Sequence, residues 1–280
     1  MSVAKPFFFL GFRSFSSAIA LLAPAAVIAC GTSGAPSAET TTERAMEVVE
    51  YGAGDATVVF ESGLGDDWQP WQLVAPEVAE QARVFAYSRP GYGQSEPTTE
   101  PRDAEHIVED LRALLAARGY APPYVLVGHS LGGGYMELFA KAHPEEITGV
   151  VFVDPRHRDF TTACAEAGIE GCVPPASIVA SLPEVQIDEL EGYAQTSEEV
   201  RVHGTFGSYP VRVLTATSHG FSPEAEAEAE ALWESMLGEI AGEAADGEQL
   251  VFTGAGHYLQ VERAHEVSQV ILNIATATQD

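Results

Sequence analysis

Basic residues are scarce in this chain, and lysine is almost absent. Of 280 residues only 14 are Lys or Arg, against 41 Asp or Glu, and the formal net charge at pH 7 is −27. The only lysines are Lys5 and Lys141. A field of this sign repels the phosphate backbones of DNA and RNA, so the composition argues against nucleic acid as a partner.

Cysteine is also rare, and long apolar runs are missing. The three cysteines are Cys30, Cys164 and Cys172, and no C-x-x-C pair or histidine-rich cluster accompanies them. We therefore expect neither a metal site nor a cofactor. The uncharged stretch near the start, residues 14–29, is too short to span a bilayer comfortably.

The first residues have the pattern of an export signal. A basic start with Lys5 and Arg13 precedes the apolar run AIALLAPAAVIA, and residues 1–29 contain no acid, which predicts a signal peptide. Small residues before Cys30 resemble the bacterial lipobox, which implies lipidation of Cys30 and a flexible tether over 30–44. We expect an exported protein of the cell envelope, anchored to a membrane at Cys30. Ordinary secretion as a soluble or periplasmic protein is the alternative.

The other two cysteines form an even pair. Cys164 and Cys172 lie eight positions apart. In an oxidising compartment this spacing predicts a small disulfide loop, and two free thiols are the alternative.

The rest of the chain alternates apolar runs with helical segments. With 46% hydrophobic and 20% charged residues, it has the composition of a globular domain, which we place at 45–280. The runs expected to be strands are Met46–Tyr51, Ala56–Glu61, Arg83–Tyr87, Tyr124–Gly128, Ile147–Asp154, Val211–Ala216 and Gln249–Phe252. Continuously apolar strands that alternate with helices predict an α/β fold with a mostly parallel sheet, covered on both faces. Residues 155–209 break the alternation and are expected to form an inserted helical lid.

The sequence Gly128-His129-Ser130-Leu131-Gly132 follows a strand and opens a helix. A serine on such a sharp turn needs small residues two positions to either side, because the backbone there passes close to its neighbours. We therefore expect Ser130 to be a catalytic nucleophile. A tight turn with a capping serine is the alternative.

A serine nucleophile needs a base and an acid. His257 lies just after the last strand and before the last helix, so we expect it at the same sheet edge as Ser130, acting as base. Asp154 ends the strand GVVFVD and is the expected acid, because it follows the nucleophile and precedes the histidine. Asp159 and Glu224 are the alternatives.

An oxyanion hole should combine two backbone N–H groups. One belongs to Leu131, the residue after the nucleophile, and the other to the loop after the strand Ala56–Glu61. In that loop, Glu61-Ser62-Gly63-Leu64-Gly65, we expect Leu64 to donate, because its flanking glycines let the backbone approach a substrate. A flexible turn without this role is the alternative.

Three segments together resemble the α/β-hydrolase superfamily. They are Gly128–Gly132, the run SRPGYGQS at 88–95, and GAGH at 254–257, within a likeness that covers about residues 45–278. The resemblance implies an eight-stranded, mostly parallel sheet with the lid between strands 6 and 7. It also implies that Ser130, His257 and an acid form a triad. Ser62 stands where the superfamily often has histidine, Ser88 where it often has aspartate, and the acid Asp154 comes one strand earlier than usual.

The expected function is that of a cofactor-free serine hydrolase that cleaves an ester or a related acyl bond. Serine disfavours epoxide or haloalkane hydrolysis, for which members of the superfamily typically use aspartate. Because few basic residues lie near the lid, we expect a small neutral or apolar acyl substrate. Two alternatives stay open: an acyltransferase acting on envelope lipids or glycans, and a non-catalytic lipoprotein that only binds.

Overall fold

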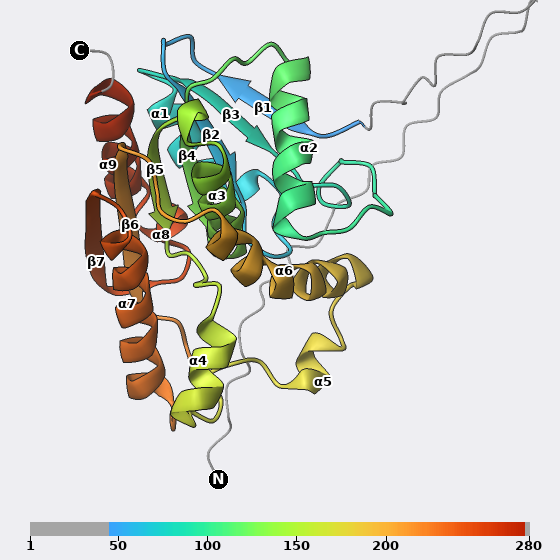
Figure 1. Cartoon of the computed structure of the whole chain (residues 1–280), viewed down its shortest axis with the longest axis vertical. Helices are drawn as coiled ribbons and strands as arrows, with labels where there is room; N and C mark the ends of the chain where they lie inside the picture. Colours follow the sequence, from blue (N-terminus) through green and yellow to red (C-terminus); the bar gives the residue numbers. More distant parts are fainter. Residues whose placement is uncertain (1–44, 278–280) are drawn as a thin grey trace, which may run out of the picture. The chain divides into compact units, whose positions relative to one another are not determined.

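A seven-stranded sheet forms the middle of residues 45–277, the part of the chain that the computed structural model describes (Figure 1). The strands are β1 (Val48–Tyr51), β2 (Thr57–Glu61), β3 (Arg83–Tyr87), β4 (Tyr124–His129), β5 (Ile147–Val153), β6 (Pro210–Ser218) and β7 (Asp246–Gly256). Their order in the sheet is β1-β3-β2-β4-β5-β6-β7. The β1 strand is antiparallel to β3, and the other pairs are parallel.

The central strands are buried on both faces. Every residue of β2 is buried, and Val58, Val59 and Phe60 have no exposed surface. Successive side chains of a strand point to opposite faces, so Val59 joins one apolar cluster while Val58 and Phe60 join another. This is why the strands are continuously apolar rather than alternating.

Helices cover each face of the sheet. One apolar cluster packs the sheet against α2 (Ala104–Ala117), α3 (Leu131–Ala142) and α7 (Glu226–Gly242). The other packs it against η1 (Gln69–Trp71), α1 (Val74–Val78), α8 (Leu259–Glu262) and α9 (Ala264–Ala277). A short turn, η2 (Pro144–Glu146), joins α3 to β5. The predicted fold class, an α/β fold with a mostly parallel sheet, is confirmed.

The expectation of eight strands is wrong for residues 45–277. Seven apolar runs were identified and each forms one strand, so an eighth strand has no run of its own in this part of the chain. The strands that the eight-strand scheme numbers 6 and 7 are β5 and β6. Between them lie α4 (Phe160–Ala167), α5 (Ala176–Val179) and α6 (Glu184–Val202), within the boundaries given for the lid. Figure 1 shows these three helices gathered at one end of the sheet.

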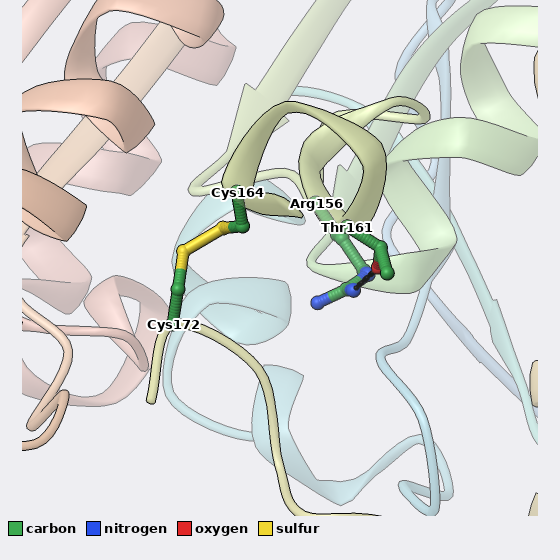
Figure 2. Close-up of a disulfide and its surroundings, with 4 residues drawn as sticks. All are labelled: Arg156, Thr161, Cys164 and Cys172. Carbon is green, nitrogen blue, oxygen red and sulfur yellow. Dashed lines mark hydrogen bonds between the residues drawn. A yellow bond between two sulfur atoms is a disulfide. The ribbon is translucent and has the colours of Figure 1, made fainter. Parts of the chain in front are cut away.

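The predicted pairing of Cys164 with Cys172 is present as a disulfide (Figure 2). Cys164 lies on α4 and Cys172 on the loop that follows, with their Cα atoms 6.1 Å apart. Both side chains are buried. The bond therefore closes a small loop within residues 155–209.

Three predictions fall outside the described residues: the signal peptide over 1–29, the lipidation of Cys30 and the tether over 30–44. Among the helices of residues 45–277, none combines enough length with enough apolar character to cross a membrane.

Candidate active site

Ser130 lies at the turn from β4 into α3. Its φ of 52° and ψ of −123° are unusual for a residue with a side chain, and it is one of two such residues with positive φ in residues 45–277. A Cβ on Gly128 would lie 2.8 Å from the carbonyl oxygen of Gly132, and one on Gly132 would lie 2.4 Å from that of Ser62. The glycines on either side of the serine are therefore required by space.

Ser130, His257 and Asp154 come together at the carboxyl ends of three strands. The Oγ of Ser130 lies 2.8 Å from Nε2 of His257, and Nδ1 of the same ring lies 2.6 Å from Oδ2 of Asp154. Since an ionised carboxylate only accepts, Nδ1 carries the proton and Nε2 is free to accept from the serine hydroxyl. The arrangement can therefore take a proton from Ser130.

Asp154 is the most enclosed member of the group, with no exposed surface. Its Oδ1 accepts from the backbone N–H of Ala216 at 2.9 Å and from the indole of Trp233 at 3.1 Å. Burial alone would raise the pKa of this carboxyl. The hydrogen bonds from His219 and His257 outweigh it and hold the pKa well below the usual range. Asp154 is therefore a carboxylate at neutral pH.

His219 is a second histidine on the same carboxylate oxygen. Its Nε2 lies 2.7 Å from Oδ2 of Asp154, and its Nδ1 lies 2.6 Å from Oε2 of Glu230 on α7. Burial opposes a charge on this ring, but the hydrogen bonds to the two carboxylates raise its pKa to about 9. His219 is therefore an imidazolium at neutral pH, donating from both nitrogens.

The sequence did not single out His219 for this role. One signal was available, because it directly follows β6, as Asp154 follows β5 and His257 follows β7. Its partner Glu230 lies 11 residues further on, within α7 and not at the end of a strand, so its position in the sequence did not indicate a role in the site.

The two alternative acids lie elsewhere. Asp159 accepts from Ser197 at 2.6 Å and from Arg201 at 2.8 Å, both on α6. Glu224 is exposed ahead of α7. Of the three candidates, Asp154 is the one that the structure brings to His257.

The two expected oxyanion donors belong to segments next to Ser130. Leu131 is the first residue of α3, where N–H groups have no acceptor within the helix. Leu64 lies in a turn that a hydrogen bond from Asp66 N to Gly63 O closes at 3.3 Å, with Gly65 at a φ of +81°. A Cβ on Gly63 would lie 3.2 Å from that of Ser130, so this turn passes directly beside Ser130.

Arg89 stabilises the turn that contains Leu64. Its guanidinium donates to the carbonyl oxygen of Ser62 at 2.6 Å and to that of Gly63 at 2.7 Å. With both carbonyls held, the peptide groups that follow are fixed in orientation. Where the superfamily often has histidine, Ser62 instead accepts from the indole of Trp71 at 3.0 Å.

Two further titratable groups border His257. His129 donates from Nε2 to the carbonyl oxygen of His257 at 3.0 Å, and burial lowers the pKa of His129 to about 3, so this ring is neutral. Asp66 accepts from Tyr258 at 3.2 Å, and burial raises the pKa of Asp66 to about 6. These groups set part of the electrostatic surroundings of His257.

Potential ligands gather twice among the described residues, in sets whose donor atoms lie within 4.8 Å of one another. One set is Asp154, His219 and His257, where the donor atoms are already hydrogen-bonded to one another. The other is His143, Glu145 and Glu146 at η2. A metal ion bound by the first set would displace the hydrogen bond between His257 and Asp154. The geometry of this set therefore suits proton transfer.

Comparisons with known proteins agree with this architecture. Residues 56–168 match the family model described as the alpha/beta hydrolase fold. The chain is 34% identical over 104 residues to the protein YqjL of Bacillus subtilis, a match that covers 37% of this chain and 41% of that one. It is 32% identical over 111 residues to the lipase LipV of Mycobacterium tuberculosis, covering 39% and 41% respectively. The chain thus matches less than half the length of these curated relatives.

Solved structures match over a longer range. An epoxide hydrolase, CorEH, superposes with a TM-score of 0.62 at 18% identity, covering 84% of this chain and 96% of that one. A thermophilic esterase from Thermogutta terrifontis superposes with a TM-score of 0.58 at 19% identity, covering 82% and 92%. Such low identities show the fold and not the activity. From the order of its strands, the family model and these superpositions, the chain has the α/β-hydrolase fold.

Proposed function

We propose that this protein is a serine hydrolase that cleaves an ester or a related acyl bond. The observation that carries the proposal is the pair of hydrogen bonds that joins Ser130 to His257 at 2.8 Å and His257 to Asp154 at 2.6 Å. A nucleophile within reach of a base, which a third group orients, is the arrangement that acyl transfer requires.

In the proposed mechanism, Oγ of Ser130 attacks the substrate carbonyl carbon while Nε2 of His257 takes the hydroxyl proton. The resulting imidazolium lies beside the Asp154 carboxylate, which stabilises its charge. The N–H groups of Leu131 and Leu64 donate to the oxyanion of the tetrahedral intermediate. His257 then returns the proton to the leaving group, and an acyl-enzyme on Ser130 remains.

Water completes the cycle. His257 accepts a proton from the water as it attacks the acyl carbon. It then gives that proton to Oγ of Ser130 as the bond between Ser130 and the acyl group breaks and the acid product leaves. An added alcohol can take the place of water in this step. Product analysis with an alcohol acceptor therefore separates hydrolysis from acyl transfer.

The known proteins support an ester-cleaving hydrolase in two ways. The relative LipV is a lipase, and the Thermogutta terrifontis protein is an esterase. An epoxide hydrolase shares the fold as well. In this chain the residue at the nucleophile position is serine, which favours acyl chemistry over the opening of an epoxide.

The test is labelling of the full-length protein with a fluorophosphonate, followed by intact-mass measurement. We expect one adduct on the parent protein and none on the Ser130→Ala variant, together with turnover of p-nitrophenyl esters that Ser130→Ala abolishes. Normal ester turnover by Ser130→Ala would contradict the mechanism. A folded parent protein that takes up no probe and cleaves no ester would favour a binding module instead.

We further propose that the enzyme works in the cell envelope, held to a membrane by lipid on Cys30, and acts on small neutral or apolar acyl substrates. Labelling of cells with an alkyne fatty acid tests the anchor. The parent chain should become labelled, whereas Cys30→Ala should not. Equal labelling of both would exclude Cys30 as the lipid site.

A further inference from the structure

The Ser130–His257–Asp154 group ends in a second pair of residues that the mechanism above does not use. We propose that His219 and Glu230 are positioning residues for catalysis: together they hold Asp154 and balance its charge, and so set the pH at which His257 acts as base. This inference rests on the proposed serine hydrolase function and extends it to two residues outside the triad.

The geometry makes the pair part of the same network. Oδ2 of Asp154 accepts from His257 at 2.6 Å and from His219 at 2.7 Å, while Oδ1 accepts from Ala216 and Trp233. All four acceptor positions of the carboxylate are thus used, and it has no freedom to rotate. Glu230 fixes His219 in turn, since its two oxygens accept from the Nδ1 and from the backbone N–H of His219, each at 2.6 Å.

The charges in the network decide what the pair does. Asp154 and Glu230 are two acids and His219 is one cation, so together they present a net charge of about −1 to His257. A plain triad presents the same charge from its acid alone. Removing His219 would leave two negative charges beside His257 and favour its protonation. Removing Glu230 would leave the positive charge of His219 balanced only by Asp154, which would disfavour protonation of His257.

Other titratable and aromatic groups also face His257. The buried His129 ring on β4 is neutral, its centroid 4.7 Å from that of His257, and Asp66 lies on the loop after β2. From α7 the indole of Trp233 contacts both histidine rings. These groups are unchanged in the variants below, so any difference between the variants comes from residues 219 and 230.

The experiment measures kcat/KM for p-nitrophenyl butyrate against pH, with the full-length parent protein, His219→Gln, Glu230→Gln and the double variant. The ring centroids of His219 and His257 are 5.7 Å apart. At this separation one unit charge should move the acid limb of the profile by about 0.5 to 1 pH unit. We expect His219→Gln to move it upward, Glu230→Gln to move it downward, and the double variant to return it toward the parent midpoint.

Glu226→Gln is the matched control. Glu226 lies one turn before Glu230 on α7 and is exposed, so the same loss of charge there should leave the profile in place. Circular dichroism and thermal melting of each variant verify that it is folded. If His219→Gln fails to fold, Glu230→Gln decides alone, because its side chain is already 15% exposed at the edge of the network.

Opposite shifts in the two single variants support the proposal, because a purely structural role would lower the rate without moving the limb in two directions. Shifts in the same direction, or no shift in either variant, would overturn it while leaving the serine mechanism intact. A parent protein without Ser130-dependent turnover would instead refute the proposed function, and this inference with it.

Discussion

Arg89 and Glu189 form a buried ion pair between the loop after β3 and α6, although they are 100 positions apart in the chain. Arg89 has 1% of its side chain exposed and Glu189 none. The same guanidinium holds the carbonyls of Ser62 and Gly63, and Glu189 also accepts from Arg102 at 2.9 Å. One buried contact thus connects the turn that contains Leu64 to α6.

Neutralising Glu189 should destabilise the fold. With Gln at this position the guanidiniums of Arg89 and Arg102 would lose a buried counter-charge, and removing one partner of such a pair costs about 3 kcal/mol or more. Urea denaturation of Glu189→Gln should show this loss in the free energy of unfolding. Glu198→Gln, which alters an exposed pair with Arg201, should have little effect. Equal stability of the parent and Glu189→Gln would refute the structural role.

The acid can be tested by a neutral replacement of the same shape. In Asp154→Asn the side-chain amide N–H can donate to Nδ1 of His257, so the ring proton moves to Nε2, which can then no longer accept from Ser130. We expect kcat to fall by about 10³- to 10⁴-fold. Stopped-flow or steady-state ester hydrolysis measures this. Asp159→Asn should keep most of the rate, because Asp159 pairs with Arg201 instead. A comparable loss in both variants would argue against Asp154 as the acid.

Asp66 should make stability depend on pH. Its pKa is about 6 in the folded protein and about 3.9 in an unfolded chain, so the folded state binds more protons between these values. Stability is therefore lost as the pH rises from about 4 to 7, by at most about 3 kcal/mol. The free energy of unfolding of Asp66→Asn, relative to that of the parent, should rise by up to this amount between about pH 4 and pH 7.

Denaturation curves at pH 4.5 and pH 8 give the comparison. The exposed Asp55 supplies the control, since Asp55→Asn should differ from the parent equally at both values. An Asp66→Asn variant whose advantage does not grow with pH would show that the carboxyl is solvated in the fold.

Loss of the disulfide should weaken the protein without stopping catalysis. A disulfide between cysteines eight positions apart, such as Cys164 and Cys172, stabilises by about 2–3 kcal/mol in the chain-entropy model. The double variant Cys164→Ser, Cys172→Ser should lose about this much in denaturation and keep its esterase activity. Activity that disappears in a folded double variant would mean that the loop shapes the site.

Much of the fold could be predicted because burial on both faces leaves a plain signal. Runs such as TVVF and GVVFVD are apolar throughout, and they form β2 and β5. Residues 69–78 form two short helices, η1 and α1, and each contains a proline. Pro70 lies in η1, and Pro76 lies in the first turn of α1, where a missing N–H costs little.

The catalytic candidates were predictable because each follows a strand. Ser130, Asp154 and His257 occupy the ends of β4, β5 and β7, and parallel strands bring their carboxyl ends to one edge. The pair of His219 and Glu230 was not predictable in this way. Their contact depends on the position of α7 along β6. Side-chain packing determines that position, and no local sequence pattern indicates it.

The ion pair between Arg89 and Glu189 also restricts how α6 can move. Moving α6 away from the sheet would separate the Glu189 carboxylate from Arg89 and Arg102, which would leave the buried Arg89 guanidinium with one counter-charge fewer. We therefore expect α6 to stay packed against the sheet. We expect any larger movement in residues 155–183, where the disulfide joins α4 to the loop that follows it.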